Sequence, residues 1–340
     1  MSDAAPNRIL IVRMSALGDI VHALPVLAAL RAAYPHVEID WLADQRYAAV
    51  LDFVEGLNQR IIGRPGLLRA VQLLRERRYD VAIDLQGLLK SAAMARLSGA
   101  KRVIGFERDL LRERGAAWFY DEATTVAADA HIVQKNLAVL PRLGVNEPSV
   151  RFPFVVPLSP VADSVAAEAA TYGPGGFVLI NPGGAWPNKR WPPERFGELA
   201  VRIRERHGLP SYVLWGEDEF LLADRVVSSS NGAAIRAPRT TLGDLLALST
   251  RAAVMVSGDT GPIHLAAAMR TPLVGLYGPT WPSRNGPWSP DDEVVSRAAR
   301  CECHHKRRCQ LDVAEGDPGV CLQDVGIDEV AAAVDRRLAR

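Results

Sequence analysis

One stretch of the sequence, residues 252–268, constrains the fold more than any other. It opens with the apolar run 252–257, whose length and β-branched residues predict a buried strand. Glycines flank the junction that follows, and Pro262 comes just before a short alanine-rich run that predicts a helix. Proline is tolerated in the first helical turn because its missing N–H would be unpaired there. The pattern therefore predicts a strand that turns directly into a helix whose N-terminus can receive an anion.

The side chains of this junction also suit a ligand. The missing Cβ of Gly261 would let a phosphate approach the backbone closely. Asp259 can cap the helix or bind a sugar hydroxyl, and we expect His264 to face back toward the junction. The alternative is an ordinary capped helix that follows a strand and binds nothing.

The same order of strand, turn and helix recurs along both halves of the chain. Apolar strands are predicted at 8–13, 37–42, 79–86, 103–106, 177–181, 211–215 and 273–277, and helices at 23–31, 67–78, 193–206, 242–249 and 327–338. The alternation predicts an α/β protein of two doubly wound, Rossmann-like domains that face each other across a cleft. The polar motifs follow the strands, at the sheet edge where such folds place ligands.

The domain boundary is expected after residue 160. Residues 145–175 are rich in Pro, Ala and Gly with weak periodicity, which indicates a linker between domains 1–160 and 161–340. A length of 340 residues fits two domains. The last helix, 327–338, either stays with the second domain or packs back on the first.

Composition excludes several classes of protein. A formal net charge of +1 gives no overall attraction to nucleic acid. No run approaches the roughly 18 apolar residues of a membrane span, and residues 1–8 lack a signal-peptide pattern. All four cysteines follow residue 300, unlike a secreted disulfide framework. These features predict a cytoplasmic protein.

Three polar groups are candidates for chemistry or ligand binding. Asp19 is a lone carboxylate after the first strand, where it can act as a general base or cap the next helix. Lys189 lies in a Gly-, Pro- and Asn-rich loop that suits a phosphate, although a surface lysine is the alternative. One acid among Glu217, Asp218 and Glu219 can bind a ribose diol, and the sequence does not say which.

A group of cysteines and histidines lies near the C-terminus. Cys301, Cys303, Cys309 and Cys321, with two histidines at 304 and 305, would supply enough ligands for zinc. Only one residue separates the first two cysteines, whereas zinc sites usually have two to four. Reduced thiols, or a disulfide formed on handling, are the interpretation that we favour.

Four motifs together resemble a known family. They are Ser15–Pro25, Asp84–Ala92, Asn188–Trp191 and Ser257–His264. In combination they are similar to the ADP-heptose:lipopolysaccharide heptosyltransferases, the family 9 glycosyltransferases of GT-B fold. The resemblance extends over residues 8–335, and the form of the first motif is closer to heptosyltransferase I than to heptosyltransferase II.

The resemblance implies an activity. Family members transfer heptose from ADP-L-glycero-D-manno-heptose, with inversion, to a Kdo sugar of the lipid A inner core at the cytoplasmic face of the inner membrane. Asp19 matches the catalytic base, and Lys189 matches the lysine that stabilises the leaving diphosphate. Donor-binding positions match Asp259, Thr260, Gly261, His264 and either Glu217 or Glu219. Acceptor-side positions match Ser15, Gly18, His22, Gln86, Lys90 and Arg112.

The resemblance also predicts no cofactor and no catalytic metal. No Asp-x-Asp motif is present to hold a divalent ion on the nucleotide, and Lys189 with a helix N-terminus can neutralise the diphosphate instead. Basic segments 69–78 and 108–114 would meet an acceptor that carries phosphates and carboxylates.

Other functions remain as alternatives. A relative with a different sugar donor or acceptor, including a protein acceptor, fits the same motifs. A nucleotide-sugar binding protein without catalysis is another, which the presence of Asp19 disfavours. An NAD-dependent oxidoreductase is disfavoured because neither half has Gly-x-Gly-x-x-Gly after a strand. The sequence leaves the acceptor and the oligomeric state open.

Overall fold

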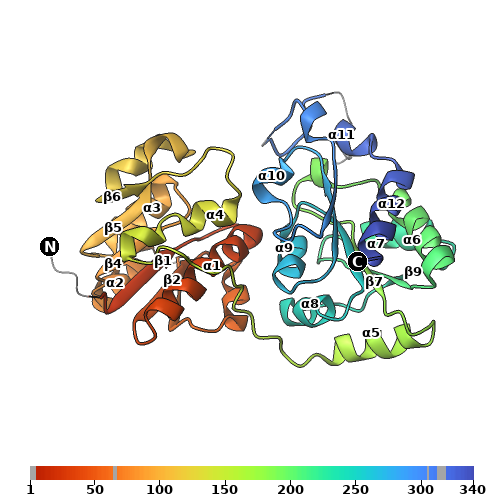
Figure 1. Ribbon diagram of the computed structural model, residues 1–340, viewed down its shortest axis with the longest axis horizontal. Helices are drawn as coiled ribbons and strands as arrows, with labels where there is room; N and C mark the ends of the chain where they lie inside the picture. The colour runs from red at the N-terminus through yellow and green to blue at the C-terminus, as the bar shows by residue number, and fades with distance from the viewer. Residues whose placement is uncertain (1–4, 64–66, 305, 312–318) are drawn as a thin grey trace. The chain divides into compact units, whose positions relative to one another are not determined.

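The computed structural model describes residues 5–63, 67–304, 306–311 and 319–340. The chain divides into two compact units, Met1–Val155 and Val156–Arg340 (Figure 1). The sequence placed the boundary after residue 160, which is the first residue of helix α5 (Pro160–Ala170).

The N-terminal unit is built on a six-stranded parallel sheet in the order β3-β2-β1-β4-β5-β6. Its strands are β1 (Arg8–Val12), β2 (Glu38–Ala43), β3 (Gln59–Ile62), β4 (Val81–Asp84), β5 (Arg102–Phe106) and β6 (Glu122–Thr124). The central strand β1 is apolar and buried along Ile9–Val12, as expected for a parallel sheet covered on both faces. Strands β3 and β6 were not predicted, because these short edge strands are largely polar or exposed and lack an apolar run.

Helices α1 (Leu17–Ala33), α2 (Leu67–Arg77), α3 (Leu89–Leu97) and α4 (Ile132–Leu137) complete this unit, with short 3₁₀ helices η1 (Ala48–Phe53), η2 (Arg108–Leu110), η3 (Arg114–Phe119) and η4 (Leu140–Leu143). Helix α1 packs against α4, whereas α2 and α3 share a core with Leu10 and Val12 of β1. Helix α1 begins six residues before the predicted start at Ala23, and Pro25 lies inside it. The predicted start was wrong, because residues 17–22 belong to the same helix as the apolar run that follows them.

The C-terminal unit has a second six-stranded parallel sheet, in the order β12-β11-β10-β7-β8-β9. Its strands are β7 (Val178–Asn181), β8 (Ser211–Val213), β9 (Ala234–Arg236), β10 (Val254–Gly258), β11 (Leu273–Tyr277) and β12 (Glu293–Ser296). Its remaining elements are η5 (Pro187–Lys189), α6 (Pro193–His207), α7 (Phe220–Ser228), α8 (Leu242–Ser249), α9 (Gly261–Ala268), α10 (Pro282–Asn285), η6 (Ala298–Arg300), α11 (Val320–Gln323) and α12 (Ile327–Leu338). Strand β11 and helices α8 and α12 confirm the predicted bounds.

The two sheets have the same topology. Numbered from the first strand of each unit, both run 3-2-1-4-5-6, the order of doubly wound nucleotide-binding folds. In each sheet the first three strands are added toward one edge, and the fourth strand then pairs with the first, so that the last three strands are added toward the other edge. The switch lies between β1 and β4 in the N-terminal unit and between β7 and β10 in the C-terminal unit. Such switch points open a crevice at the carboxyl ends of the strands, and this is where the fold places ligands.

One expectation for the C-terminal half needs revision, and one open alternative is resolved. Residues 160–170, taken as part of a linker, form helix α5, which Ser159 caps by accepting a hydrogen bond from the Ala162 N–H at 3.0 Å. The sequence analysis did not predict this helix, because its apolar face consists mostly of alanine and gives a weak hydrophobic period. The final helix α12 packs on α6, β11 and β12, so its apolar face contributes to the core of the C-terminal unit.

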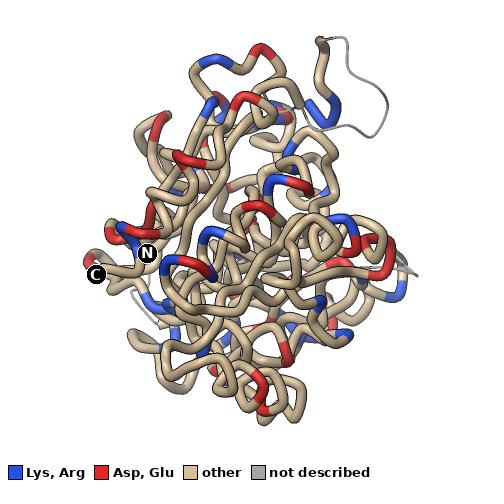
Figure 2. The backbone as a smooth tube through the Cα atoms, turned by 90° about the vertical axis from the view of Figure 1, so that its right-hand side faces the viewer, with Lys and Arg blue, Asp and Glu red and all other residues tan. Residues whose placement is uncertain are grey.

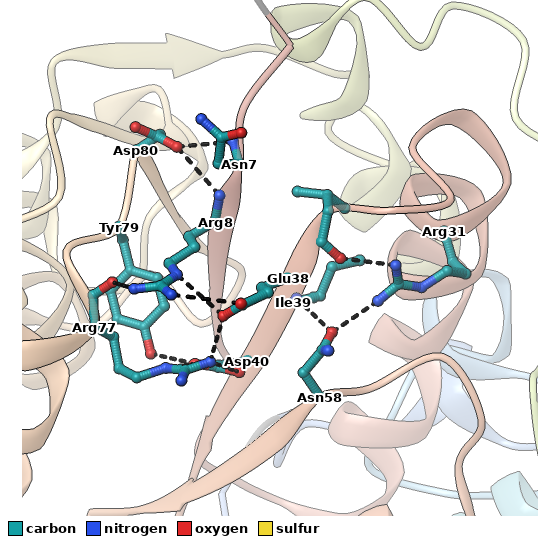
Figure 3. Close-up of polar contacts among 11 residues, drawn as sticks. Asn7, Arg8, Arg31, Glu38, Ile39, Asp40, Asn58, Arg77, Tyr79 and Asp80 are labelled. Atoms are coloured by element: carbon teal, nitrogen blue, oxygen red, sulfur yellow. Dashed lines mark hydrogen bonds and ion pairs between the residues drawn. The ribbon is translucent and has the colours of Figure 1, made fainter.

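Charged side chains are distributed along both units. Figure 2 shows Lys and Arg interspersed with Asp and Glu along the backbone, in keeping with the small net charge. At the amino ends of β1 and β2, Arg8 and Arg77 alternate with Glu38 and Asp40, and the Tyr79 hydroxyl donates to Asp40 at 2.7 Å (Figure 3). In the part of the chain that the structure describes, no helix has both the length and the hydropathy to span a bilayer.

Candidate functional site

Two loops leave the N-terminal sheet at its switch point and contact each other. The loop after β1 leads into Asp19, and the loop after β4 contains Gln86. The Gln86 Oε1 accepts a hydrogen bond from the Met14 N–H at 2.7 Å, and its Nε2 donates to the Ser15 Oγ at 3.4 Å. The structure therefore brings Ser15 and Gln86 together, as the sequence predicted for the carboxyl edge of the sheet.

Asp19 lies in the first turn of α1, in an arrangement that fixes its carboxylate. Its Oδ1 pairs with the Arg13 Nη2 at 2.7 Å, and its Oδ2 accepts from the Ala16 N–H at 3.0 Å. The capping alternative is thus partly realised, although the N-cap residue itself is Ala16. The side chain remains 42% exposed. Since each carboxylate oxygen has two lone pairs, both can still accept another donor.

Arg13 is a site residue that the sequence analysis missed. It is buried, it donates through Nη1 to the Leu85 carbonyl, and its own carbonyl accepts from the Trp41 Nε1 at 3.0 Å. Arg13 therefore connects the ends of β1 and β4 and holds Asp19 between them. A basic residue that ends an otherwise apolar strand was the available signal.

Asp84 fixes the turn that carries Gln86. Its fully buried carboxylate accepts from the backbone N–H groups of Gln86 and Gly87 at 2.9 and 3.2 Å, from Ser91 Oγ at 2.9 Å and from the Tyr120 hydroxyl at 2.8 Å. Burial raises the pKa of Asp84 above its ordinary value, and these hydrogen bonds oppose the rise. Because it is buried and saturated, Asp84 acts on the loop and cannot reach a substrate.

Lys90 lies near the same edge, close to Asp44 in the exit from β2. The pKa of Asp44 is lowered, first by a hydrogen bond from Arg46 and, more weakly, by the charge of Lys90. His22 is buried, with its ring edge-on to that of His131 at 5.8 Å, and Gly18 is buried in the first turn of α1.

Arg112 is exposed in the segment between η2 and η3. The neighbouring Glu113 accepts from the Leu89 N–H at 2.7 Å, which attaches this segment to the start of α3 beside Lys90. Among the described residues, no contact joins Arg112 to Asp19 or Gln86, so the structure brings Arg112 near the acceptor candidates without linking it to them.

At the switch point of the C-terminal unit, a buried asparagine ties the two central strands together. The Asn181 Nδ2, at the end of β7, donates to Ser257 Oγ and to Thr260 Oγ1, both at 2.9 Å. Thr260 is the N-cap residue of α9, yet its side chain makes no capping hydrogen bond. The helix begins at Gly261, one residue before the expected first position at Pro262, and its first N–H groups have no partner within the helix. This geometry leaves the anion site of the helix N-terminus available.

Asp259 is the centre of a buried polar cluster. It pairs with the Lys189 Nζ at 2.6 Å, lies 3.1 Å from the His264 Nε2 and accepts from the Thr280 hydroxyl at 2.7 Å. Burial alone would raise the pKa of Asp259, but the hydrogen bond to His264 and the charge of Lys189 lower it well below its ordinary range. The carboxylate is therefore ionised and orients the lysine and the histidine. Thr280 was not predicted, because the Pro-rich loop around it gave no signal.

The loop that carries Lys189 lies directly against β10. A Cβ on Gly258 would collide with the Lys189 carbonyl, so this close approach requires glycine. The Lys189 ammonium also lies 4.8 Å from the centre of the Trp186 ring, a cation–π contact. Lys189 and the start of α9 thus lie at one edge of one unit, as expected for a diphosphate site.

The structure distinguishes the two glutamates. The Glu219 carboxylate accepts from the Gly184 N–H at 2.8 Å and from the Gly216 N–H at 3.0 Å, so it bridges the loops after β7 and β8. Glu217 is 86% exposed and pairs with Arg239 at 3.0 Å. Of the two, Glu219 is the one held at the strand ends.

The four cysteines are free thiols, of which Cys301 and Cys303 are buried. The Cys303 Sγ lies 3.8 Å from the Cys309 Sγ and accepts from the Gln310 N–H at 2.8 Å. Within the described ranges no three His, Cys, Asp or Glu side chains are arranged to hold a metal ion, and His305 lies outside these ranges.

Comparison with protein families identifies the group to which these features belong. The model of glycosyltransferase family 9 (heptosyltransferase) matches residues 67–314, more than two thirds of the chain. The chain belongs to glycosyltransferase family 9. It is therefore a glycosyltransferase, as the motifs predicted.

Relatives in this family align over most of their length. Lipopolysaccharide heptosyltransferase 1 of Pseudomonas aeruginosa is 32% identical over 91% of this chain and 89% of its own. The enzyme of the same name from Escherichia coli K12 is 26% identical over 86% of this chain and 94% of its own.

Solved structures of this family share the fold. E. coli heptosyltransferase WaaC with ADP has a TM-score of 0.74 at 24% identity, and the match covers 98% of each chain. A family 9 glycosyltransferase from Veillonella parvula has a TM-score of 0.79 at 23% identity over 99% of each chain. The fold class is GT-B with two Rossmann-like domains, as the resemblance implied.

Proposed function

We propose that this family 9 glycosyltransferase is an inverting heptosyltransferase of lipopolysaccharide core synthesis. It would transfer heptose from ADP-L-glycero-D-manno-heptose to a Kdo residue of the inner core. Asp19 would act as general base and Lys189 would stabilise the leaving diphosphate. The names of its relatives, lipopolysaccharide heptosyltransferase 1 in P. aeruginosa and E. coli, support this donor and product. WaaC has been solved with ADP and with ADP-2-deoxy-2-fluoro heptose.

The observation that carries the proposal is the accessibility of Asp19. Three carboxylates lie at or after the carboxyl ends of β1, β2 and β4; the Asp44 side chain is only 9% exposed, and Asp84 is fully buried. The Asp19 side chain is 42% exposed, so a bound acceptor hydroxyl can reach it. A general base needs such contact, at about 2.6–3.2 Å from the proton donor.

The chemistry follows as a single displacement. The acceptor hydroxyl oxygen attacks the anomeric carbon of heptose as the bond from that carbon to the phosphate oxygen breaks. The hydroxyl proton passes to Asp19, and ADP leaves with the bonding electrons. Attack on the face opposite the leaving group inverts the anomeric centre.

Donor binding uses the edge around α9. The first-turn N–H groups of α9 and the Lys189 ammonium would bind the diphosphate, where charge increases as ADP leaves. Asp259 and His264 would orient Lys189 and the adjacent sugar hydroxyls, with Thr260 and Gly261 beside the phosphates. We propose that Glu219 binds the ribose hydroxyls and that the exposed Glu217 does not contact the donor. The proposal requires no metal ion and no cofactor.

The acceptor would bind at the edge of the N-terminal unit. Ser15, Gly18 and His22 belong to the loop and first turn around Asp19, and Gln86, Lys90 and Arg112 supply polar and basic groups beside it. A Kdo acceptor carries a carboxylate, and lipid A carries phosphates, which suit Lys90 and Arg112. Because this acceptor is anchored in lipid, the enzyme would act at the cytoplasmic face of the inner membrane.

A product analysis tests the proposal. The protein is incubated with ADP-heptose and Kdo-lipid A acceptors, and mass spectrometry and NMR follow the product. We expect a mass increase of one heptose, with the α-linkage or β-linkage opposite to that of the donor. Hydrolysis of ADP-heptose without an acceptor product, or transfer only from another nucleotide sugar, would contradict it. Binding of ADP-heptose without any turnover would favour a non-catalytic binding protein.

A further inference from the structure

The edge of the N-terminal unit formed by β3 and α2 exposes large aliphatic side chains. Leu68 is 88% exposed, Leu73 46% and Ile62 40%. The other side of α2 is ordinary core, since Ala70 and Leu74 are buried with residues of β1. Helix α2 is thus apolar toward the core and also carries isolated leucines on its solvent face.

Arginines surround these exposed leucines. Residues 67–78 contain four arginines and one acid, Glu76. Arg77 forms ion pairs with Glu38 and Asp40, as Figure 3 shows. Arg69, Arg75 and Arg78 are exposed, and the ion pairs of the described residues include none for these three. Arg75 Nε donates to the Leu97 carbonyl at 3.0 Å, and among the described residues no carboxylate pairs with any of the three.

Grooves lie on both sides of α2. One of about 640 Å³ runs between α2 and the edge strand β3, and its lining includes Arg60, Arg69, Ile62 and Leu73. Another of about 540 Å³ on the opposite side is lined by Leu68, Arg75 and Arg78 among others. Glu76 also lines both grooves, but arginines outnumber it in each, so each groove combines apolar side chains with a net positive charge, which suits an amphiphilic and anionic surface.

This face begins next to the loop of the proposed base. Gly63, which follows β3, lies so close to Met14 that a Cβ would come within 2.7 Å of the Met14 Cε. Met14 belongs to the segment that Gln86 holds beside Ser15. The first turn of α2, with Leu68, therefore starts at the same sheet edge as Asp19.

The second basic segment does not share these properties. Residues 108–114 contain three arginines and two acids. Asp109 lies 3.6 Å from Arg114, and Glu113 is bound to the Leu89 N–H. Its formal charge is +1, against +3 for residues 69–78, so the charge argument favours α2 over this segment.

We propose that the β3–α2 face docks on the anionic surface of a lipid bilayer. Leu68, Leu73 and Ile62 would enter the interface between headgroups and acyl chains, and Arg69, Arg75 and Arg78 would contact the headgroups. Amphipathic helices bind membranes by this combination, and each basic residue near an anionic surface adds to the attraction. The inference rests on the proposed function in one respect, because a lipid-anchored acceptor gives the enzyme a reason to dock there.

Vesicle sedimentation of the full chain tests this surface without substrates. The probes are phosphatidylcholine vesicles with and without phosphatidylglycerol, at low and at high salt. We expect binding only to the anionic vesicles and weaker binding at high salt. The variant Arg69→Gln/Arg75→Gln/Arg78→Gln should bind roughly tenfold to a hundredfold more weakly, and Leu68→Gln/Leu73→Gln should also weaken binding.

Matched changes in the C-terminal unit provide the controls. Arg225→Gln/Arg236→Gln/Arg239→Gln removes three exposed arginines, and Leu221→Gln changes a leucine that is 76% exposed. We expect both controls to bind vesicles like the wild type. Melting temperatures verify that each variant is folded.

Transfer to a water-soluble acceptor without acyl chains separates this proposal from the proposed function. If the α2 variants lose vesicle binding and keep this transfer, the docking surface is supported. The proposal would be overturned if the wild-type protein does not bind anionic vesicles, or if the α2 variants bind them as tightly as the wild type. Loss of soluble transfer in folded arginine variants would also overturn it, since these arginines would then bind the acceptor itself. Absence of any transfer by wild type, with vesicle binding intact, would refute only the proposed function.

Discussion

Asp19 and Lys189, at the two switch points, differ in their solvent exposure and in the partners that their charged groups already have. Asp19 is held on both oxygens and is still reached by solvent. The Lys189 side chain is only 16% exposed and pairs with Asp259 at 2.6 Å. An ammonium has three donors, so Lys189 can bind a diphosphate oxygen while it keeps Asp259.

Lys189→Ala should therefore weaken ADP-heptose binding. A charge-assisted hydrogen bond contributes about 1.5–3 kcal/mol, which corresponds to roughly a tenfold to a hundredfold loss of affinity. Arg190→Ala is the neighbouring control, because the Arg190 Nε donates to the Gly184 carbonyl at 2.8 Å. Calorimetry on both variants measures the difference. Unchanged donor affinity in Lys189→Ala would show that this lysine has no part in donor binding.

The lowered pKa of Asp259 predicts how stability depends on pH. The folded-state pKa lies below the value of about 3.9 for an unfolded chain. Asp259 therefore stabilises the fold above about pH 4, and this contribution is lost as the pH falls below that value. Asp259→Asn should cost about 3 kcal/mol at pH 7, because Lys189 loses its buried partner.

The same substitution should flatten the acid limb of the stability curve. Denaturant unfolding from about pH 7 to pH 3 should show the wild type losing more free energy of unfolding below pH 4 than Asp259→Asn loses. Parallel curves for the two proteins would mean that Asp259 has a similar pKa in the folded and unfolded states.

At the scale of elements, helix α9 is the best test of the donor site. Its first turn is uncapped by a side chain, and Thr260 is engaged with Asn181. Gly261→Val would place a branched side chain where we expect the diphosphate, so ADP affinity should collapse. His264→Ala should weaken donor binding less, because the backbone N–H groups remain.

Melting temperature and ADP affinity, measured on the same Gly261→Val protein, separate binding from folding. A lower melting temperature with normal ADP affinity would identify Gly261 as a structural residue only. A folded variant that binds ADP normally would remove α9 from the proposed donor site.

Elements differed in how well the sequence predicted them. Strand β11 and helices α8 and α12 were predicted to the residue, because an apolar run or a 3.6-residue period identifies a buried face. Strands β3 and β6 lie at sheet edges, and α5 is rich in alanine, so neither type gives a strong local pattern. In the site, the sequence predicted the positions that follow strands. It missed Arg13, Asp84 and Thr280, whose roles come from contacts between residues distant in sequence.

At the scale of the whole molecule, the two units have the same topology, and we assign donor binding to one and proton transfer to the other. The strand order places Asp19 at the switch point of one unit, and Lys189 and α9 at that of the other. In the proposed function, this shared topology with different side chains would place the base in one unit and the anion site in the other. Donor binding and proton transfer should therefore respond separately to substitution.

Asp19→Asn tests this central claim most directly, through ADP-heptose affinity and the rate of heptose transfer measured on one protein. General-base catalysis contributes about 10² to 10⁴ in rate, so the rate should fall at least about a hundredfold. Donor affinity should stay at the wild-type value, and a melting curve verifies that the variant is folded although Arg13 loses its carboxylate partner. Asp52→Asn, which removes an exposed carboxylate that pairs with Arg60, should keep the wild-type rate. An Asp19→Asn enzyme that retains more than about a third of the wild-type rate would contradict the account.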